Sequence, residues 1–222
     1  MNQSLVQKQF GVAAADYATS SVHASGPSLQ RLVELVSPQR NWTALDIATG
    51  AGHMALAVAP LVQRVIATDI TDAMLAETAK LAAERRLANV ETATAEAGQL
   101  PFAGDSFDLV TCRLAAHHFP DPAAFVAESF RVLRPGGTFA LIDNVAPDAS
   151  MLPLATPAEV LNAAQTFNQY EKTRDPSHAR ALPLFEWKML LSKVGFADAS
   201  TELLDQHIAF GAWTERMRCA PE

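Results

Sequence analysis

The stretch that decides the fold is WTALDIATGAGH, residues 42–53. Its first half runs apolar from Ala44 with an acid at Asp46, which is typical of a parallel strand buried on both faces. Its second half, residues 49–52, has no bulky side chain, and glycine there permits positive φ and close approach of a ligand to the main chain. An apolar helical pattern begins at His53. Strand, small-residue turn and helix in this order predict a nucleotide site at the carboxyl end of a sheet.

The glycine spacing fits two kinds of nucleotide-binding protein and also a tight turn without any ligand. Gly50, Gly52 and Ala55 match the loose dinucleotide fingerprint, which is weak evidence by itself. Asp46 instead makes an acid-x-x-x-Gly-x-Gly arrangement, which resembles motif I of the class I S-adenosylmethionine-dependent methyltransferases. His53 stands where that motif usually has a third glycine. The resemblance implies that the cofactor is bound by Asp46, Ala48, Thr49, Gly50 and Gly52.

Composition restricts the class of protein. The chain has 222 residues, which suits one α/β domain with a sizeable core, and we expect residues 1–222 to form a single domain. A net charge of −7 argues against a nucleic-acid backbone as the main partner. Two distant cysteines and an N-terminus without an apolar core are what we expect of a cytoplasmic protein. No run of about 18 apolar residues is present, so we expect no membrane span.

A second strand is predicted over residues 64–70, and it also ends in an acid. In either nucleotide-binding interpretation, a carboxylate at the position of Asp69 accepts hydrogen bonds from the ribose hydroxyls. Such a charge-assisted bond contributes about 1.5–3 kcal/mol, so Asp69 is the strongest expected anchor of the adenosine half. The alternative role for Asp69 is to cap the next helix, for which Thr71 is the better candidate. The resemblance adds Ile70 to the cofactor-binding residues.

A third predicted strand, residues 89–94, leads into a more specific pattern. Glu96-Ala97 precedes Leu100-Pro101-Phe102, and Ser106-Phe107-Asp108 then begins a strand that extends to Arg113. This order resembles the methyltransferases of ubiquinone and menaquinone biosynthesis (methyltransferase type 11). The resemblance implies that Glu96 binds the adenine amino group and that the Ala97 N–H binds a ring nitrogen. Aspartate is the commoner acid at the position of Glu96, and a solvated loop charge is the alternative.

The fourth strand ends where the methyl donor and the acceptor are expected to meet. Arg113 is suited to pair with a carboxylate, either that of the cofactor or that of an anionic substrate. His118 is a candidate general base or hydrogen-bonding group, and its neighbour His117 is a candidate substrate contact. No acid-histidine metal signature surrounds this pair, so we predict no metal site.

The fifth strand is predicted over residues 138–143. It follows a helix over residues 122–132 and the segment Arg-Val-Leu-Arg-Pro-Gly-Gly, residues 131–137. That segment also resembles the family, and we expect Pro135 to stop the helix and the glycines to form the turn. Asp143 at the strand end is a second candidate catalytic residue, as a base or an orienting group.

Two regions outside the predicted sheet are expected on the substrate side. Residues 1–25 form either a lid over the cofactor or a terminal arm, and Tyr17 in them is a candidate substrate contact. Residues 147–183 are broken by prolines, contain a helical stretch near residues 159–170 and are typical of a substrate-side insertion. Its polar stretch offers three candidate ligands for an anionic substrate group, with a solvated loop as the alternative: Arg174, His178 and Arg180.

The predicted fold is a doubly wound, Rossmann-like, mostly parallel sheet with helices on both faces. Residues 199–210 form a candidate sixth strand, but we find no final antiparallel strand, which this fold usually has. The predicted function is S-adenosylmethionine-dependent methyl transfer to a small-molecule acceptor. The alternatives are an NAD-type oxidoreductase, for which no Tyr-x-x-x-Lys is present, and a non-catalytic cofactor-binding module. The sequence leaves the acceptor and the oligomeric state open.

Overall fold

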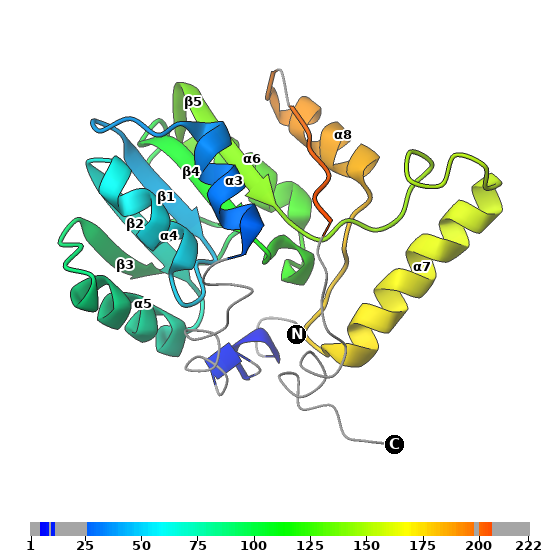
Figure 1. Cartoon of the computed structure of the whole chain (residues 1–222), viewed down its shortest axis with the longest axis horizontal. Helices are drawn as coiled ribbons and strands as arrows, with labels where there is room; N and C mark the ends of the chain where they lie inside the picture. The colour runs from blue at the N-terminus through cyan, green and yellow to red at the C-terminus, as the bar shows by residue number, and fades with distance from the viewer. Residues whose placement is uncertain (1–4, 9, 12–25, 198–199, 206–222) are drawn as a thin grey trace.

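The computed structural model describes residues 5–8, 10–11, 26–197 and 200–205 (Figure 1). Residues 5–8 and 10–11 are helical. The strands are β1 (Thr43–Ile47), β2 (Arg64–Asp69), β3 (Val90–Thr94), β4 (Phe107–Arg113) and β5 (Leu133–Ile142). The α-helices are α3 (Pro27–Val36), α4 (His53–Val58), α5 (Asp72–Glu84), α6 (Pro122–Val132), α7 (Pro157–Arg174) and α8 (Leu184–Val194). Two short 3₁₀ helices are η1 (Ala59–Leu61) and η2 (Ala116–His118).

The five strands form one parallel sheet in the order β3-β2-β1-β4-β5. The chain therefore winds outward from β1 in one direction through β2 and β3, and then crosses to the other side through β4 and β5. β1 and β4 are the neighbours at which the winding reverses. In such a sheet the loops at the carboxyl ends of these two strands separate and leave a crevice.

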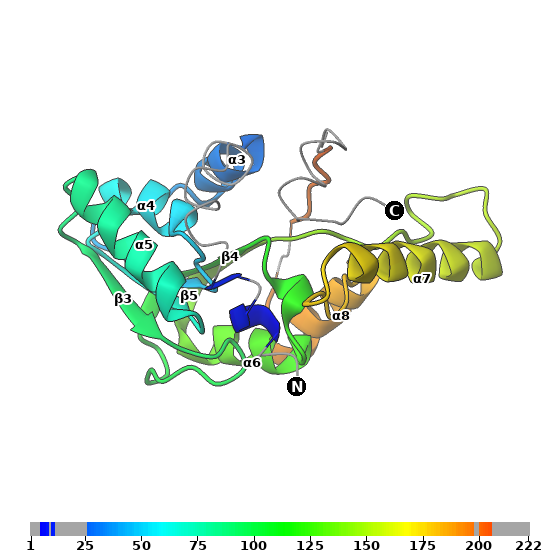
Figure 2. The same ribbon diagram turned by 90° about the horizontal axis from the view of Figure 1, so that it is seen from below.

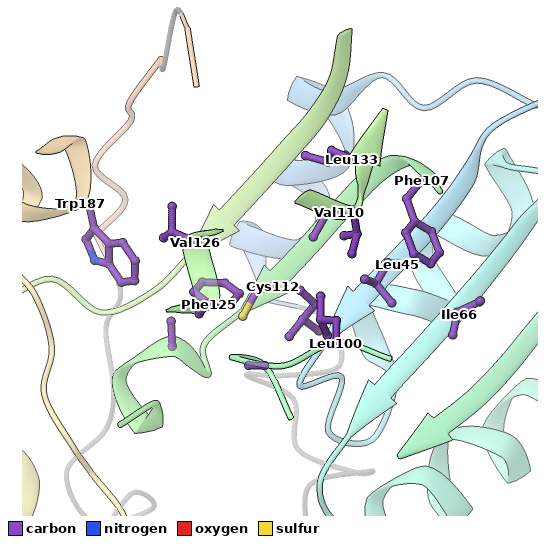
Figure 3. Close-up of a cluster of buried hydrophobic side chains, with 14 of the residues drawn as sticks. Leu45, Ile66, Leu100, Phe107, Val110, Cys112, Phe125, Val126, Leu133 and Trp187 are labelled. Atoms are coloured by element: carbon purple, nitrogen blue, oxygen red, sulfur yellow. The ribbon is translucent and has the colours of Figure 1, made fainter. Parts of the chain in front are cut away.

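Helices cover both faces of the sheet. The helices α3, α4 and α5 lie on one face, and α6 and α8 lie on the other (Figures 1 and 2). On the first face Leu29 and Met54 pack on small strand residues such as Ala44. On the second face the core contains Leu45, Phe125 and other buried side chains (Figure 3). β1 is buried from Ala44 to Ile47 because consecutive residues point to opposite faces and both faces are packed.

The segment between β5 and α8 extends away from the sheet. α7 begins with a capping box, in which Thr156 and Glu159 satisfy each other's backbone N–H groups. This helix projects to one side of the body in both views (Figures 1 and 2). The chain returns to the sheet after Arg174, where the Ala179 and Arg180 N–H groups both donate to the His117 carbonyl, at 2.9 and 3.0 Å.

The predicted elements agree with the structure except at β5 and in the C-terminal region. β5 begins at Leu133, immediately after α6, rather than at residue 138. Phe107 pairs with Leu133 and Leu109 with Thr138, so the Pro-Gly-Gly segment is an irregular start of the strand. The helix therefore ends before Pro135, and Gly136 has φ +80°.

The expected sixth strand is wrong for the part of it that can be tested. Residues 200–205 contain no strand. The rest of the predicted range, residue 199 and residues 206–210, lies outside the described residues. Glu202 instead binds Arg31 of α3, with a shortest N–O distance of 2.8 Å. In the described part of the chain the sheet has only parallel strands. No helix there combines the length and apolarity that crossing a bilayer requires.

Candidate active site

A cavity of about 340 Å³ lies at the carboxyl ends of β1, β2 and β4. This volume is within the usual range for small-molecule sites, about 300–1,000 Å³. Ten of the residues expected from the sequence line the cavity: Asp46, Ala48, Thr49, Gly50, Asp69, Ile70, Glu96, Ala97, Arg113 and His118. Parallel strands bring these residues together because their carboxyl ends lie at one edge of the sheet, although they are far apart in sequence.

The turn after β1 packs against α5 on one side and is open to the cavity on the other. Gly50 and Gly52 both have positive φ, +55° and +86°, which glycine adopts without a steric penalty. A Cβ atom at Gly50 would meet no atom within 4 Å, whereas one at Gly52 would lie 2.6 Å from the buried Thr78 side chain. Thr78 also donates from Oγ1 to the Gly50 carbonyl at 2.9 Å. Gly52 therefore does not line the cavity but lets the turn pack closely on α5.

Asp69 links the turn to the end of β2. Its Oδ2 accepts a hydrogen bond from the Gly50 N–H at 3.0 Å, and its Oδ1 accepts one from the Thr71 N–H at 2.9 Å. Burial raises the pKa of Asp69, while these two hydrogen bonds oppose the shift. Each carboxylate oxygen can accept a second hydrogen bond, so the group that shapes the turn can also accept two hydroxyl donors.

Asp46 is held on the floor of the cavity by two threonines. The Oγ1 atoms of Thr49 and Thr111 donate to its two carboxylate oxygens, each at 2.6 Å. Burial raises the pKa of Asp46 to about 6, and the two hydroxyls oppose that shift. Arg113 lines the same cavity and donates from Nη2 to Ser28 Oγ at 3.0 Å. Burial lowers the pKa of this guanidinium, and the charge of Asp46 counteracts the effect.

The outer wall of the cavity comes from two further segments. Glu96 is exposed at the rim, and Ala97 behind it is buried. Val6 and Phe10, from the N-terminal helical residues, also line the cavity. Gln7 fixes that segment with a hydrogen bond from Nε2 to the Ile70 carbonyl at 2.9 Å.

His118 is the histidine of η2 that lines the cavity, and its ring makes two kinds of contact. Nδ1 lies 3.1 Å from Ser177 Oγ, and Phe10 packs against the ring edge to face at 5.1 Å between centroids. Burial lowers the pKa of His118 to about 3, and the neighbouring charge of His117 adds to the shift. His118 is therefore neutral in the folded protein at ordinary pH.

His117 and Asp143 do not line this cavity but form a buried pair behind it. His117 Nδ1 donates to Asp143 Oδ1 at 2.5 Å, and both side chains are more than nine-tenths buried. Burial alone would lower the pKa of His117, but the attraction of Asp143 outweighs it and raises the pKa. Asp143 therefore favours the protonated form of His117.

The three expected substrate ligands of the insertion are not at the cavity. Arg174 pairs with Glu171 in the last turn of α7. His178 is buried, and its Nε2 lies 2.9 Å from Asn168 Oδ1. Arg180 is exposed and pairs with Glu186 at 2.5 Å. The sequence could not distinguish these internal pairs from a binding site, because both use the same residue types.

Two other sequence-based expectations concern the substrate contact Tyr17 and a metal site. Tyr17 lies outside the described residues. No group of histidine, cysteine, aspartate or glutamate side chains in the described part of the chain has a geometry that could hold a metal ion.

A second, larger cavity of about 720 Å³ runs beside β5, where Asp143, Trp187 and residues 200–205 line it.

Several residues of the site were not identified from sequence. Val6, Phe10 and Ser28 belong to no motif in the sequence, so no local pattern assigns them to the site. Ser177 and Asp175 lie in the polar stretch of the insertion, next to the cationic residues that a sequence pattern favours for binding an anion. The Asp-x-Ser spacing was the available signal, since a serine two residues after an aspartate commonly bonds to its carboxylate.

Comparisons with known proteins give the family. Residues 45–141 match the methyltransferase domain family. The chain is 35% identical over 207 residues to an uncharacterized methyltransferase, YcgJ, of Bacillus subtilis, covering 93% of this chain and 78% of the relative. This chain belongs to the class I S-adenosylmethionine-dependent methyltransferases.

Solved structures give the same result for this methyltransferase. The crystal structure of the Bacillus subtilis YcgJ protein has a TM-score of 0.79 at 34% identity, covering 87% of this chain and 78% of that one. A putative methyltransferase from Bacillus halodurans has a TM-score of 0.75 at 36% identity, covering 88% and 80%. A ubiquinone/menaquinone biosynthesis C-methyltransferase of a Marinomonas species is 35% identical over 49% of this chain and 45% of its own length.

Membership in this family favours a methyltransferase over the NAD-type oxidoreductase, and the cavity of this methyltransferase suits S-adenosylmethionine. Gly50 leaves room above the turn where a cofactor can approach the main chain. Asp69 retains acceptor capacity for two hydroxyls beside that turn. Asp46 places a carboxylate in the cavity, which suits a cationic ligand.

Proposed function

We propose that this enzyme transfers the methyl group of S-adenosylmethionine to a small-molecule acceptor by in-line displacement. The observation that carries the proposal is the joint position of Asp46, Gly50 and Asp69 around one cavity at the carboxyl ends of β1 and β2. A relative named for ubiquinone and menaquinone biosynthesis supports a small-molecule acceptor. The proposal makes the segment between β5 and α8 the substrate side of a single domain.

Each cofactor contact is assigned to a residue that lines the cavity. In the proposal, Asp69 accepts from the ribose hydroxyls, while Glu96 and the Ala97 N–H bind the adenine. Arg113, half-buried and held by Ser28, binds the carboxylate of the methionine part. Asp46 contributes negative charge near the amino and sulfonium groups.

The chemistry requires little of the protein besides alignment. When bound, S-adenosylmethionine supplies a methyl carbon whose bond to sulfur breaks, with its electron pair left on sulfur, as the acceptor atom bonds to that carbon. The cavity walls exclude water and orient the acceptor, and alignment of this kind corresponds to effective molarities of about 10⁵–10⁸ M in the best cases. His118 is the group that receives the acceptor's hydrogen bond, because it is the described histidine of η2 that lines the cavity.

Binding and transfer test the proposal separately. Calorimetric titration with S-adenosylmethionine should give a saturable isotherm, and titration with NAD should give none. Incubation with methyl-labelled cofactor and a small-molecule extract should then give a labelled product that remains after removal of macromolecules. Label found only in protein or nucleic acid would contradict the small-molecule acceptor.

A further inference from the structure

We propose that Ser177 and Asp175, in the segment after α7, hold the His118 ring with its proton on Nδ1, so that the lone pair on Nε2 is presented to the acceptor. The three side chains form a buried chain: Asp175 and Ser177 are 2% and 1% exposed, and His118 is 9% exposed. His118 alone among the three lines the cavity. Ser177 and Asp175 are thus positioning residues, and the role of Nε2 rests on the proposed function.

The direction of the hydrogen bonds follows from a count of protons. Ser177 Oγ lies 2.6 Å from Asp175 Oδ1 and 3.1 Å from His118 Nδ1. Two oxygen atoms at 2.6 Å require a hydrogen between them, and a carboxylate cannot supply it. The single hydroxyl hydrogen is therefore directed to Asp175. Ser177 Oγ can then only accept from the ring, which requires a proton on Nδ1.

The backbone supports the same arrangement. The Ser177 N–H donates to Asp175 Oδ1 at 2.8 Å, so this oxygen accepts two hydrogen bonds, as an ionised carboxylate does well. The Ala179 and Arg180 N–H groups fix the segment on the His117 carbonyl. The position of Ser177 relative to η2 is therefore set in part by two main-chain hydrogen bonds to the His117 carbonyl.

The opposite tautomer is poorly matched to these contacts. A proton on Nε2 would find Asp175 Oδ2 at 3.9 Å, beyond hydrogen-bonding distance. It would also leave the Nδ1 lone pair facing the Ser177 oxygen, whose hydrogen is already engaged. The His117 ring lies 4.2 Å away between centroids, and a charge on it opposes protonation of His118. A neutral ring protonated on Nδ1 satisfies all of these contacts.

The inferred tautomer gives His118 a definite task in methyl transfer. Nε2 accepts the hydrogen bond of an acceptor O–H or N–H and so orients the attacking lone pair. Because burial and the neighbouring His117 lower the pKa of His118 to about 3, the ring does not keep the acceptor's proton, which is released to water once the acceptor has taken the methyl group.

Nitrogen NMR of the protein labelled with ¹⁵N-histidine tests the inference without any acceptor. Long-range ¹H–¹⁵N correlations distinguish the protonated from the unprotonated ring nitrogen, and the His118→Gln variant assigns the signal among the six histidines. We expect Nδ1–H in the wild type. Ser177→Ala removes the acceptor of that proton, so the tautomer ratio should move about three- to tenfold toward Nε2–H.

The chain offers a matched control in the same insertion. Ser150 donates from Oγ and from N to Asp148 Oδ1, at 2.5 and 2.9 Å, which repeats the Asp-x-Ser arrangement. In the described part of the chain Ser150 makes no hydrogen bond to a histidine, so Ser150→Ala should leave the His118 tautomer unchanged. An Nε2–H ring in the wild type would overturn the proposal, whether or not the variants fold. An unchanged ratio in Ser177→Ala, or an equal change in Ser150→Ala, would also overturn it.

Calorimetry separates this inference from the proposed function. Ser177→Ala should bind S-adenosylmethionine within about twofold of the wild type, because Ser177 does not line the cavity. Failure of the wild type to bind the cofactor would overturn the proposed function and with it the role of Nε2, whereas the tautomer would stand. A loss of binding confined to Ser177→Ala would show that Ser177 serves the cofactor, and it would refute the assignment to the acceptor.

Discussion

Four residues around the cavity have pKa values that burial moves away from their usual range. The pKa of Asp46 is raised to about 6 and that of Asp69 is also raised, whereas the pKa of His118 is lowered to about 3 and that of Arg113 is also lowered. Each shift disfavours the charged form, as expected where water is excluded. The cavity therefore has the low-dielectric character in which a few polar contacts determine how a charged ligand binds.

The Asp69 carboxylate should be needed for cofactor affinity. In Asp69→Asn one oxygen is replaced by an amide donor, which cannot accept from a hydroxyl and faces a backbone N–H. We expect S-adenosylmethionine affinity to fall at least about tenfold, with a stability loss of about 1–3 kcal/mol. Calorimetry and denaturant unfolding measure the two effects. Asp105→Asn, in an exposed loop, is the control, and equal affinity in both variants would contradict the assignment.

The His118→Gln variant should change how stability depends on pH. The folded pKa of His118 is about 3 against an unfolded value of 6.5, so only the unfolded state takes up a proton between these values. The contribution of His118 is therefore lost as pH falls, by up to about 1.4 kcal/mol per unit. Asp46 acts in the opposite sense, because its folded pKa of about 6 lies above 3.8.

The difference in stability between the wild type and His118→Gln reports the contribution of His118 alone. The charged groups that face it are His117, Asp143 and Asp175, and all three remain in the variant. The free energy of unfolding of the wild type relative to His118→Gln should rise between about pH 4 and pH 6. Tryptophan fluorescence in denaturant measures it at each pH. A difference that is flat with pH would mean that His118 is protonated normally in the folded state.

At the scale of single elements, the turn between β1 and α4 contains one glycine that serves packing and another that faces the cavity. Gly50 and Gly52 both have positive φ, but only Gly52 is packed against another element. Two non-glycine residues that line the same cavity, Ala48 and Leu114, also have positive φ, 52° and 55°. They follow β1 and β4 directly, so two of the five described non-glycine residues with positive φ lie at the ends of the strands that border the crevice.

The two glycines of this turn should respond differently to alanine. In Gly50→Ala the new methyl group meets no protein atom, so we expect a loss of about 1 kcal/mol from the positive φ. Cofactor affinity should fall much more, because the methyl group occupies the open side of the turn. In Gly52→Ala the Cβ would lie 2.6 Å from Thr78, so stability should fall by several kcal/mol.

Denaturant unfolding and S-adenosylmethionine titration of both variants check this contrast. A stable Gly52→Ala protein would show that α5 can move away from the turn. Unchanged affinity in Gly50→Ala would mean that the cofactor does not approach the main chain there.

At the scale of the whole molecule, the winding of the sheet creates the crevice and the later segments close it. The loops after β1 and β4 diverge and leave the crevice, and Val6 and Phe10 of the N-terminal helical residues line it on one side. The segment after α7 returns from outside the sheet to contact η2. Residues that are far apart in the chain thus meet at the end of β4.

Cofactor binding should stabilise the molecule in a pattern that follows this architecture. At a concentration of 100 times the dissociation constant, a ligand stabilises the folded state by about 2.7 kcal/mol. Hydrogen exchange with mass spectrometry should show slower exchange in residues 48–54, 69–74 and 113–118. Exchange in the outer part of α7 should not change. Protection confined to residues 137–145, beside the second cavity, would place the ligand elsewhere.

The sequence alone determined the parallel sheet, its winding and the cofactor family. These features depend on local signals: an apolar strand, an acid at its end and a turn without side chains. β5 was predicted to begin five residues late because a Pro-Gly-Gly segment usually marks a turn, and only its pairing with β4 reveals an irregular strand. Because such signals are short-range, they identify the strands and the cofactor turn correctly but misplace the start of β5, which depends on pairing with a distant strand.

Only the tertiary structure decided which polar residues of the insertion are near the site. Arg174, His178 and Arg180 pair with Glu171, Asn168 and Glu186, whereas the neutral Ser177 reaches the ring of His118. Sequence gives the chemical type of a side chain but not its partner. A partner across 59 residues is fixed by how the chain returns to the sheet, and no local pattern encodes that path.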